Sequence, residues 1–150
     1  MIQIKELNHQ PFTDISQLLH ESEVRFARTA LEIPGLRLRH EPVKISNREF
    51  PSIGVTVPDF IVTNQSGSVG AVVEVTVSFL SAENKQMQIK KCGCWLGERD
   101  EEYGICVRRN RLVHDNVNLP NPLSLVVIGR PAIFDEHVIQ RCIRRVVLGD

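Results

Sequence analysis

The chain has 150 residues, of which 42% are hydrophobic and 24% charged, enough to build one hydrophobic core. We therefore expect residues 1–150 to form a single domain. The formal net charge is zero, which argues against a generally basic surface, although the arginines cluster in "VRRNR" and "RCIRRVV". Four cysteines, no signal peptide and no membrane-length apolar segment predict a cytoplasmic protein without a membrane attachment.

Residues 14 to 31 carry the first strong pattern. Apolar side chains recur at helical spacing, and Asp14 is placed to cap the segment. The pattern predicts one amphipathic helix, which a Pro-Gly pair then ends. Glu23 lies three residues before Phe26, so it projects along the edge of the apolar stripe rather than straight into solvent.

Strand patterns follow this helix. Residues 36–45 alternate as in a half-buried strand, and residues 59–64 and 71–79 flank the turn signal "NQSGSVG", which predicts a hairpin. Asp59 opens the first strand of the hairpin and Glu74 lies in the middle of the second, so we expect the two carboxylates to meet across the sheet. A charge among valines is costly unless it is paired, hydrogen-bonded or bound to a metal.

The second half of the chain is predicted to contain a helix at 82–96, strands at 103–110 and 123–129, and a last helix at 134–148. Lys85 falls on the inner stripe of the first of these helices. Its side chain is therefore expected to point toward the sheet.

Three acidic residues occur in a recognisable order: Glu23 in "SEVRFARTAL", Asp59 in "PDF" and Glu74 in "VVEVT". With the order helix, strand, hairpin, helix, strand, they resemble the PD-(D/E)XK nuclease superfamily over roughly residues 15 to 111. The resemblance implies an α/β protein of restriction-endonuclease-like fold, with a central mixed sheet of four to five strands flanked by helices on both sides. The chain departs from the family where Thr76 replaces the expected lysine.

The resemblance implies a metal-dependent endonuclease that hydrolyses phosphodiester bonds, in DNA rather than RNA. This reaction needs an activated water and neutralisation of phosphate charge, which Mg2+ or Mn2+ supplies. Oxygen ligands suit Mg2+, so we expect Asp59 and Glu74 to bind the ion directly and Glu23 to bind through water or hold a second ion. Lys85 is the expected substitute for the missing lysine. Gln88 resembles a glutamine that some members keep on this helix.

These residues also have purely structural interpretations. Glu23 is equally consistent with an ordinary surface residue, and Asp59 with a cap of the turn before its strand. For Glu74 the structural alternative is an internal salt bridge to Arg25 or Lys85. Lys85 would otherwise pack its stem on the sheet, with its ammonium in solvent.

The cysteines do not indicate a zinc site. Cys92 and Cys94 form C-x-C rather than C-x2-C, and Cys106 and Cys142 do not add a compact second pair. Cys92 and Cys106 are expected to be small core residues. The five histidines are scattered and indicate no site.

Three classes of function are therefore open: a metal-dependent nuclease, a catalytically weakened relative that binds nucleic acid or a protein partner, and an α/β protein without an enzymatic role. Thr76 favours the second class, whereas the three acids and Lys85 favour the first. A homodimer or a partner protein is expected to supply specificity, because the chain has little room for a recognition domain. We also expect a phosphate-binding groove lined by the clustered arginines Arg108, Arg109, Arg111, Arg141, Arg144 and Arg145.

Overall fold

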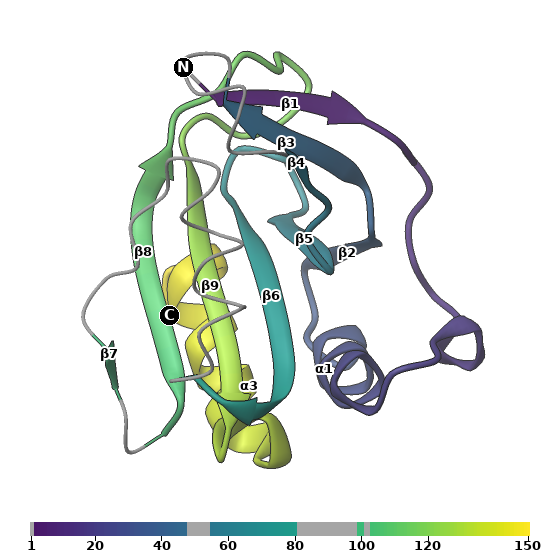
Figure 1. Cartoon of the computed structure of the whole chain (residues 1–150), viewed down its shortest axis with the longest axis vertical. Helices are drawn as coiled ribbons and strands as arrows, with labels where there is room; N and C mark the ends of the chain where they lie inside the picture. The colour runs from purple at the N-terminus through teal and green to yellow at the C-terminus, as the bar shows by residue number, and fades with distance from the viewer. Residues whose placement is uncertain (1, 48–54, 81–98, 101–102) are drawn as a thin grey trace.

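We describe residues 2–47, 55–80, 99–100 and 103–150 of a computed structural model of the chain (Figure 1). No helix in these ranges is long and apolar enough to cross a membrane. The elements are β1 (Ile2–Glu6), a 3-10 turn (Ile15–Gln17), α1 (Glu21–Leu31), β2 (Leu36–His40), β3 (Val43–Asn47), β4 (Val55–Thr56), β5 (Phe60–Asn64), β6 (Gly70–Phe79), β7 (Arg99–Asp100), β8 (Ile105–Leu112), β9 (Leu123–Arg130), a second 3-10 turn (Ala132–Phe134), α3 (Glu136–Ile143) and a π-helical turn (Arg144–Leu148).

The central sheet has the strand order β2-β5-β6-β9-β8-β7. β6 and β9 run parallel, and the other neighbouring pairs are antiparallel, so the predicted α/β class with a mixed sheet is confirmed. Five strands of this sheet have five or more residues, in agreement with the predicted four to five, and the two-residue β7 adds a sixth at the edge. The apolar runs of β6 and β9 occupy the middle of the sheet, where both strand faces are buried.

The predicted hairpin of β5 and β6 is confirmed. Phe60 pairs with Val73 at the open end of the hairpin. At the closed end, the side-chain oxygen of Asn64 accepts the backbone N–H of Ser68 at 2.9 Å, and Gly67 takes the left-handed φ of 72° that the turn requires. This polar turn fixes the register of the two strands, and with it the position of their carboxylates.

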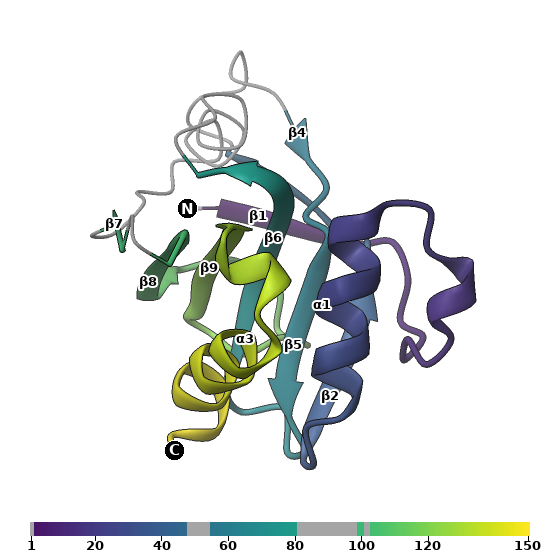
Figure 2. The same cartoon turned by 90° about the horizontal axis from the view of Figure 1, so that it is seen from below.

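Both described helices, α1 and α3, lie on one face of the central sheet and pack against each other (Figure 2). Phe26 of α1 and Ile139 of α3 are buried against β-strand residues such as Val73 and Ile128. The prediction of helices on both faces is therefore not met by the described helices. The helix predicted for residues 82–96 lies outside the described residues.

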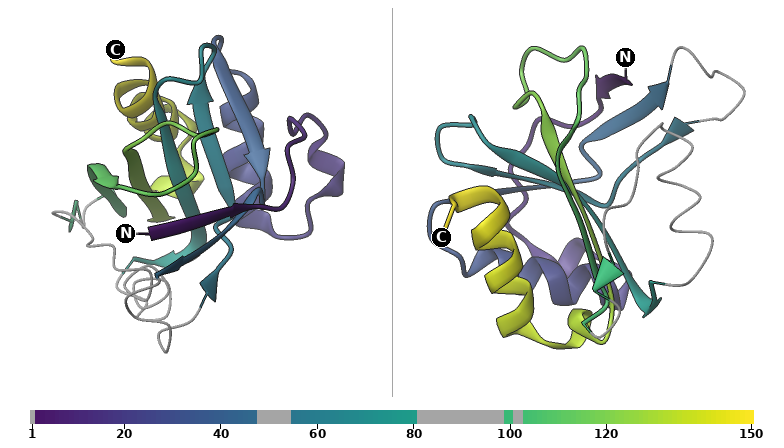
Figure 3. Two further views of the ribbon diagram at one scale, coloured as in Figure 1. Left: turned by 90° about the horizontal axis from the view of Figure 1, so that it is seen from above. Right: turned by 90° about the vertical axis from the view of Figure 1, so that its left-hand side faces the viewer.

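A small antiparallel sheet, in the order β1-β3-β4, covers the other face of the central sheet (Figure 3). Its apolar side chains, including Ile4 and Ile45, form a second core with Ile61, Val72 and Val127. Because β-strand side chains alternate between faces, β5 and β6 supply both cores at once. Both cores therefore depend on the strands that carry the candidate acidic residues.

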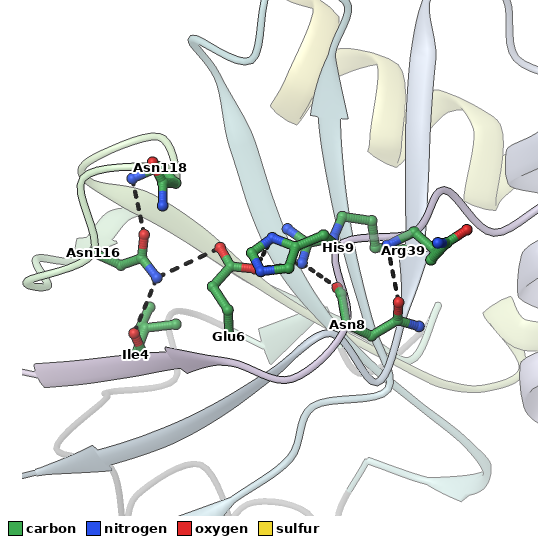
Figure 4. A network of polar contacts seen from close by, with 8 residues as sticks. Ile4, Glu6, Asn8, His9, Arg39, Asn116 and Asn118 are labelled. Atoms are coloured by element: carbon green, nitrogen blue, oxygen red, sulfur yellow. Dashed lines mark hydrogen bonds and ion pairs between the residues drawn. The ribbon is translucent and has the colours of Figure 1, made fainter.

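Polar contacts tie the small sheet to the central sheet (Figure 4). The carboxylate of Glu6 at the end of β1 accepts from Arg39 of β2 at 2.6 Å, and it lies 3.2 Å from Nδ1 of His9. Arg39 also donates to the backbone carbonyl of Asn8, and Asn116 donates to Glu6 at 3.5 Å. Glu6 is 11% exposed, so this charge is buried with partners rather than alone. In this network the carboxylate of Glu6 has a structural role, because it links the small sheet to the central sheet.

The predicted helix over residues 14–31 is divided in the structure. The Asp14 carboxylate accepts both the backbone N–H of Ser16 at 3.0 Å and its hydroxyl at 2.6 Å, so Asp14 caps a 3-10 turn. These hydrogen bonds hold the pKa of Asp14 below its usual range. Leu19, which would lie on the apolar stripe of a continuous helix over residues 14–31, is 92% exposed, and α1 begins at Glu21. The local side-chain hydrogen bonds favour a separate turn over a continuous helix.

The predicted strand over residues 36–45 is also divided. Glu41 takes a left-handed φ of 43°, and Pro42 lacks the N–H that a continuous ladder would need. The chain therefore leaves the central sheet after β2 and enters the small sheet as β3. The strands predicted at 103–110 and 123–129 are found as β8 and β9.

The last predicted helix, over residues 134–148, begins slightly later in the structure. Asp135 caps α3, since its carboxylate accepts the N–H of His137 at 3.1 Å and of Val138 at 3.3 Å. The helical turns then continue to Leu148 in π-helical form.

Candidate functional site

Asp59 and Glu74 meet across β5 and β6, as the sequence predicted. Glu74 accepts the backbone N–H of Asp59 at 3.1 Å, and the Asp59 carboxylate accepts the backbone N–H of Val75 at 2.8 Å. Each carboxylate is thus oriented by the neighbouring strand. Glu74 is only 2% exposed, whereas Asp59 is half-buried.

The end of the β5–β6 ladder explains this geometry. The last paired residues are Phe60 and Val73, and Asp59 comes immediately before the start of β5. Its carboxylate supplies an acceptor to β6 just beyond the point where the β5 backbone stops pairing. Asp59 therefore has a structural role as a cap, in addition to any role as a ligand.

Glu23 comes to the same end of the sheet from the first turn of α1. It is 5% exposed, and its Oε1 lies 2.6 Å from Nε2 of His40 at the end of β2. The ring of His40 lies against Phe12 and Phe60, with centroid distances of 5.4 and 5.2 Å. A histidine packed between aromatic rings thus holds the Glu23 carboxylate. The interpretation of Glu23 as an ordinary surface residue is wrong.

Glu41 joins this pair and links it to Asp59. Its Oε1 lies 3.3 Å from the same His40 nitrogen, and its backbone N–H donates to the Asp59 carbonyl at 2.8 Å. Ligand atoms of Glu23, His40 and Glu41 all lie within 4.8 Å of one another, so the group could hold a metal ion. Two carboxylates and an imidazole offer two oxygens and one nitrogen.

A pocket of about 350 Å³ lies beside these carboxylates, between the start of α1 and the C-terminal half of β6. Glu23, Asp59 and Thr76 all line it. The Thr76 hydroxyl accepts the backbone N–H of Ser78 at 3.1 Å. We call this the acidic pocket. Its remaining lining residues are His20, Glu21, Ser22, Val75 and Val77.

The expected site residues are therefore brought together in part. Glu23 and Asp59 share the acidic pocket, and Glu74 is hydrogen-bonded to Asp59 but does not line the pocket. Lys85 and Gln88 lie outside the described residues. Arg25, considered as a salt-bridge partner of Glu74, instead pairs with Glu21 at 3.0 Å.

The sequence interpretation missed His40 and Glu41. The alternation of β2 places His40 on the same face as Leu38, which is buried under the helices, and this was a usable signal. Glu41 could not be found in this way, because it follows the end of β2 and its position depends on its own left-handed φ of 43°.

Three of the six predicted groove arginines share a pocket of about 420 Å³ between β8 and α3. Arg109, Arg141 and Arg145 line it, and no acidic residue is found among its described lining residues. Arg109 donates to the Arg145 carbonyl at 3.4 Å. We call this the arginine groove. Its other lining residues are Tyr103, Ile105, Val107, Val138, Cys142 and Val146.

The other three arginines do not line this groove. Arg144 pairs with Asp150 at 3.1 Å. Arg108 follows Val107 in β8 and so leaves the strand from the opposite face, while Arg111 is exposed near the end of β8. The predicted groove thus exists in part, with half of its expected members.

The two described cysteines, Cys106 and Cys142, lie in different surroundings. Cys106 is buried in the core beneath the small sheet, as predicted. Cys142 lines the arginine groove, where burial raises the pKa of its thiol to about 11 despite the nearby Arg109 and Arg145. A neutral thiol is a poor nucleophile. Cys92 and Cys94 lie outside the described residues.

Comparisons of the chain with protein-family models, with curated proteins and with solved structures find no significant match.

Proposed function

We propose that this chain is a metal-dependent nuclease of restriction-endonuclease-like fold, which hydrolyses phosphodiester bonds in DNA rather than RNA. The observation that supports the proposal most directly is the pocket that Glu23 and Asp59 share, together with the hydrogen bond from the backbone N–H of Asp59 to Glu74. These residues come from α1, from the position before β5 and from the middle of β6, and Glu23 also belongs to a cluster with His40 and Glu41.

Asp59 and Glu74 are the proposed direct ligands of a Mg2+ or Mn2+ ion. A buried carboxylate such as Glu74 must be stabilised by hydrogen bonds or by positive charge, and one of its oxygens already accepts the N–H of Asp59. The backbone bonds orient both carboxylates before any ion binds. When bound, the ion would lower the pKa of a water and neutralise charge on the phosphate.

Glu23, His40 and Glu41 form the second proposed ligand set. The imidazole of His40 makes this set better suited to a transition-metal ion such as Mn2+ than to Mg2+, which prefers oxygen ligands. Comparing the two ions by calorimetry is therefore informative. Tighter binding of Mn2+ in the wild type, reduced in His40→Gln, is the expected result.

Thr76 limits the catalytic part of the proposal. Its hydroxyl lines the acidic pocket and can position a water by hydrogen bonding, but it cannot supply the positive charge of a lysine. Lys85 is the proposed source of that charge. Its loss in Lys85→Ala is expected to slow cleavage while metal binding is kept.

A second candidate function is a catalytically weakened nuclease-fold subunit that binds nucleic acid or a protein partner. Thr76 at the lysine position and the engagement of Glu23 by His40 favour this alternative. Both features leave fewer free charged groups for chemistry at the acidic pocket.

A cleavage assay separates the two candidates. Supercoiled, linear and single-stranded DNA, and RNA, are incubated with Mg2+ or Mn2+, with the wild type and Asp59→Asn side by side. We expect the wild type to cleave at least one of these substrates. Both chelation of the metal ion and the Asp59→Asn substitution should abolish this cleavage. Nucleic-acid binding without cleavage of any of these substrates, and without metal binding by calorimetry, would favour the weakened subunit instead.

A further inference from the structure

Two exposed aromatic side chains, Phe79 and Phe134, alternate with arginines in one row. The guanidinium carbon of Arg130 lies 5.7 Å from the ring centroid of Phe79 and 5.1 Å from that of Phe134. On the other side, the guanidinium carbon of Arg25 lies 4.5 Å from the Phe134 centroid. We call the row Phe79, Arg130, Phe134 and Arg25 the Phe-Arg ladder.

Four separate elements build the ladder. Phe79 ends β6 and pairs in register with Arg130, which ends β9. Phe134 ends the 3-10 turn that follows β9, and Arg25 lies in α1. Residues far apart in the sequence are thus brought into one row by the parallel pairing of β6 and β9.

The backbone under the ladder is held firmly. Gly104, at a φ of 72°, lies so close to β9 that a Cβ there would be 2.2 Å from the carbonyl oxygen of Arg130. The N–H of Gly129 donates to the Gly104 carbonyl at 2.8 Å, and the N–H of Ala132 to the Tyr103 carbonyl at 2.7 Å. These contacts fix the backbone on both sides of Arg130, which favours a pre-organised surface.

The ladder is open to a ligand. Phe79 is 58% exposed and Phe134 is 41% exposed, so each ring keeps a large solvent-accessible area despite its arginine neighbours. Arg130 has no acidic partner within the described ranges, whereas Arg25 pairs with Glu21. Planar apolar groups and positive charge alternate along one line, which complements the bases and phosphates of an unpaired nucleic-acid strand.

Each end of the ladder adjoins a residue that lines the acidic pocket. Glu21, the partner of Arg25, lines that pocket. Val77, which also lines it, precedes Phe79 by two residues in β6. A strand lying along the ladder would therefore pass beside the acidic pocket, which Asp59 lines.

We propose that the Phe-Arg ladder binds unpaired nucleotides of single-stranded nucleic acid and leads that strand to the acidic pocket. The inference deepens and rests on the proposed nuclease function, since it names single-stranded segments as the substrate class. Bases stack on Phe79 and Phe134, while Arg130 contacts phosphate or stacks on a base.

Fluorescence anisotropy tests the ladder in the presence of a chelator, so that binding is measured without cleavage. The probes are a labelled 12-nucleotide thymidine strand and a labelled duplex of equal length. Phe79→Leu with Phe134→Leu is expected to weaken single-strand binding about fivefold or more, because stacking on each ring is lost. Duplex binding is expected to stay within about twofold.

The matched control is Tyr103→Leu. Tyr103 is also an exposed aromatic residue, at 44%, but it lines the arginine groove rather than the ladder. The Tyr103→Leu substitution should leave the ratio of single-strand to duplex affinity unchanged. Arg130→Lys keeps the charge and loses the planar group, so it should lower this ratio while the salt dependence of binding is kept.

The results distinguish the two levels of the argument. Phe79→Trp enlarges the ring available for stacking, so it is expected to raise the single-strand affinity. If the double variant folds with unchanged single-strand affinity and Phe79→Trp gives no increase, the ladder proposal is wrong, even if the wild type cleaves DNA. Ladder-dependent single-strand binding without any cleavage supports the ladder and rejects the nuclease. If the double variant fails to fold, the Arg130→Lys and Phe79→Trp measurements decide. A wild type that binds neither probe at low salt overturns the ladder.

Discussion

The acidic pocket and the arginine groove are two concentrations of like charge in a chain whose net charge is zero, but they are built differently. The carboxylates of Glu23 and Glu74 are buried, and each has a short contact to a histidine or a backbone N–H. Arg141 and Arg145 are exposed, and neither has an acidic partner in the described part of the chain. The acidic side chains are therefore fixed by their contacts within the fold, whereas these arginine side chains project from its surface.

This difference predicts different responses to mutation. A buried charge is stabilised by specific partners, so changing it affects folding and any chemistry together. An exposed unpaired charge contributes little to stability and acts mainly through long-range attraction, which salt screens. The acidic residues should therefore be tested with isosteric variants, and the arginines with charge reversal.

The largest effect is expected for the two proposed ligands. Asp59→Asn and Glu74→Gln keep the shape and an oxygen acceptor but remove the charge that would bind a metal ion. Metal-dependent DNA cleavage should fall by more than the roughly 10- to 100-fold that loss of an outer-shell partner costs. Initial rates of plasmid nicking at saturating Mn2+ measure this loss.

Asp59→Ala is the control that separates the ligand role from the capping role. It removes the acceptor of the Val75 N–H and should lower the free energy of unfolding by about 1–3 kcal/mol, whereas Asp59→Asn should cost less. Urea denaturation of the metal-free protein gives both values. Equal stability of the two variants would show that the Asp59–Val75 hydrogen bond does not contribute as the geometry indicates.

The next largest effect is expected at His40. His40→Ala would leave the buried carboxylate of Glu23 without its 2.6 Å partner and would remove a ring packed against Phe12 and Phe60. We expect the free energy of unfolding at pH 7 to fall by about 1–3 kcal/mol. The double variant His40→Ala with Glu23→Gln should recover part of this loss, because the unpaired charge is gone. No recovery would mean that the ring packing, rather than the pair, supplies the stability.

A smaller effect, on binding alone, is expected in the arginine groove. Arg145→Glu places a negative charge beside Arg109, so the slope of log affinity for DNA against log salt should decrease by about 1. Arg144→Glu is the matched control: it is the adjacent residue, but its side chain pairs with Asp150 and lies outside the groove lining. Anisotropy titrations between low and moderate salt compare the two. If both variants change the salt dependence of DNA binding equally, Arg145 in the groove contributes no more to binding than Arg144 outside it.

The sequence predicted those features that depend on local patterns. The alternation of the valines and the turn after Asn64 were sufficient to pair β5 with β6, and this register brings Asp59 to Glu74. The apolar run over residues 123–129 was sufficient to locate β9. These predictions are correct because a two-residue period and a polar turn are properties of short segments.

The remaining features depend on contacts between distant segments. The Glu23–His40 pair joins α1 to β2, and the Phe-Arg ladder requires the parallel pairing of Phe79 with Arg130. The division of residues 36–45 between two sheets depends on a left-handed backbone at Glu41, which glutamate rarely adopts. Single-sequence patterns contain no signal for such long-range geometry.

The smallest expected effect concerns Cys142, at the floor of the arginine groove. Its thiol pKa is raised from 9.0 to about 11 in the folded protein, so the unfolded chain loses this proton first as the pH rises. The unfolded state then binds fewer protons, and stability decreases with pH above about 9 until the folded thiol also titrates. At pH 9.5 the loss should be about 1 kcal/mol or less relative to pH 7.

Comparing the wild type with Cys142→Ala isolates this contribution, since every other titrating group is shared. The stability difference between the two proteins should shrink by this amount from pH 7 to pH 9.5 in urea denaturation under reducing conditions. Slow alkylation of the native thiol at pH 8, relative to the urea-unfolded chain, is the companion measurement. A stability difference that is constant with pH, together with fast native alkylation, would show that the nearby arginines lower the thiol pKa as much as burial raises it.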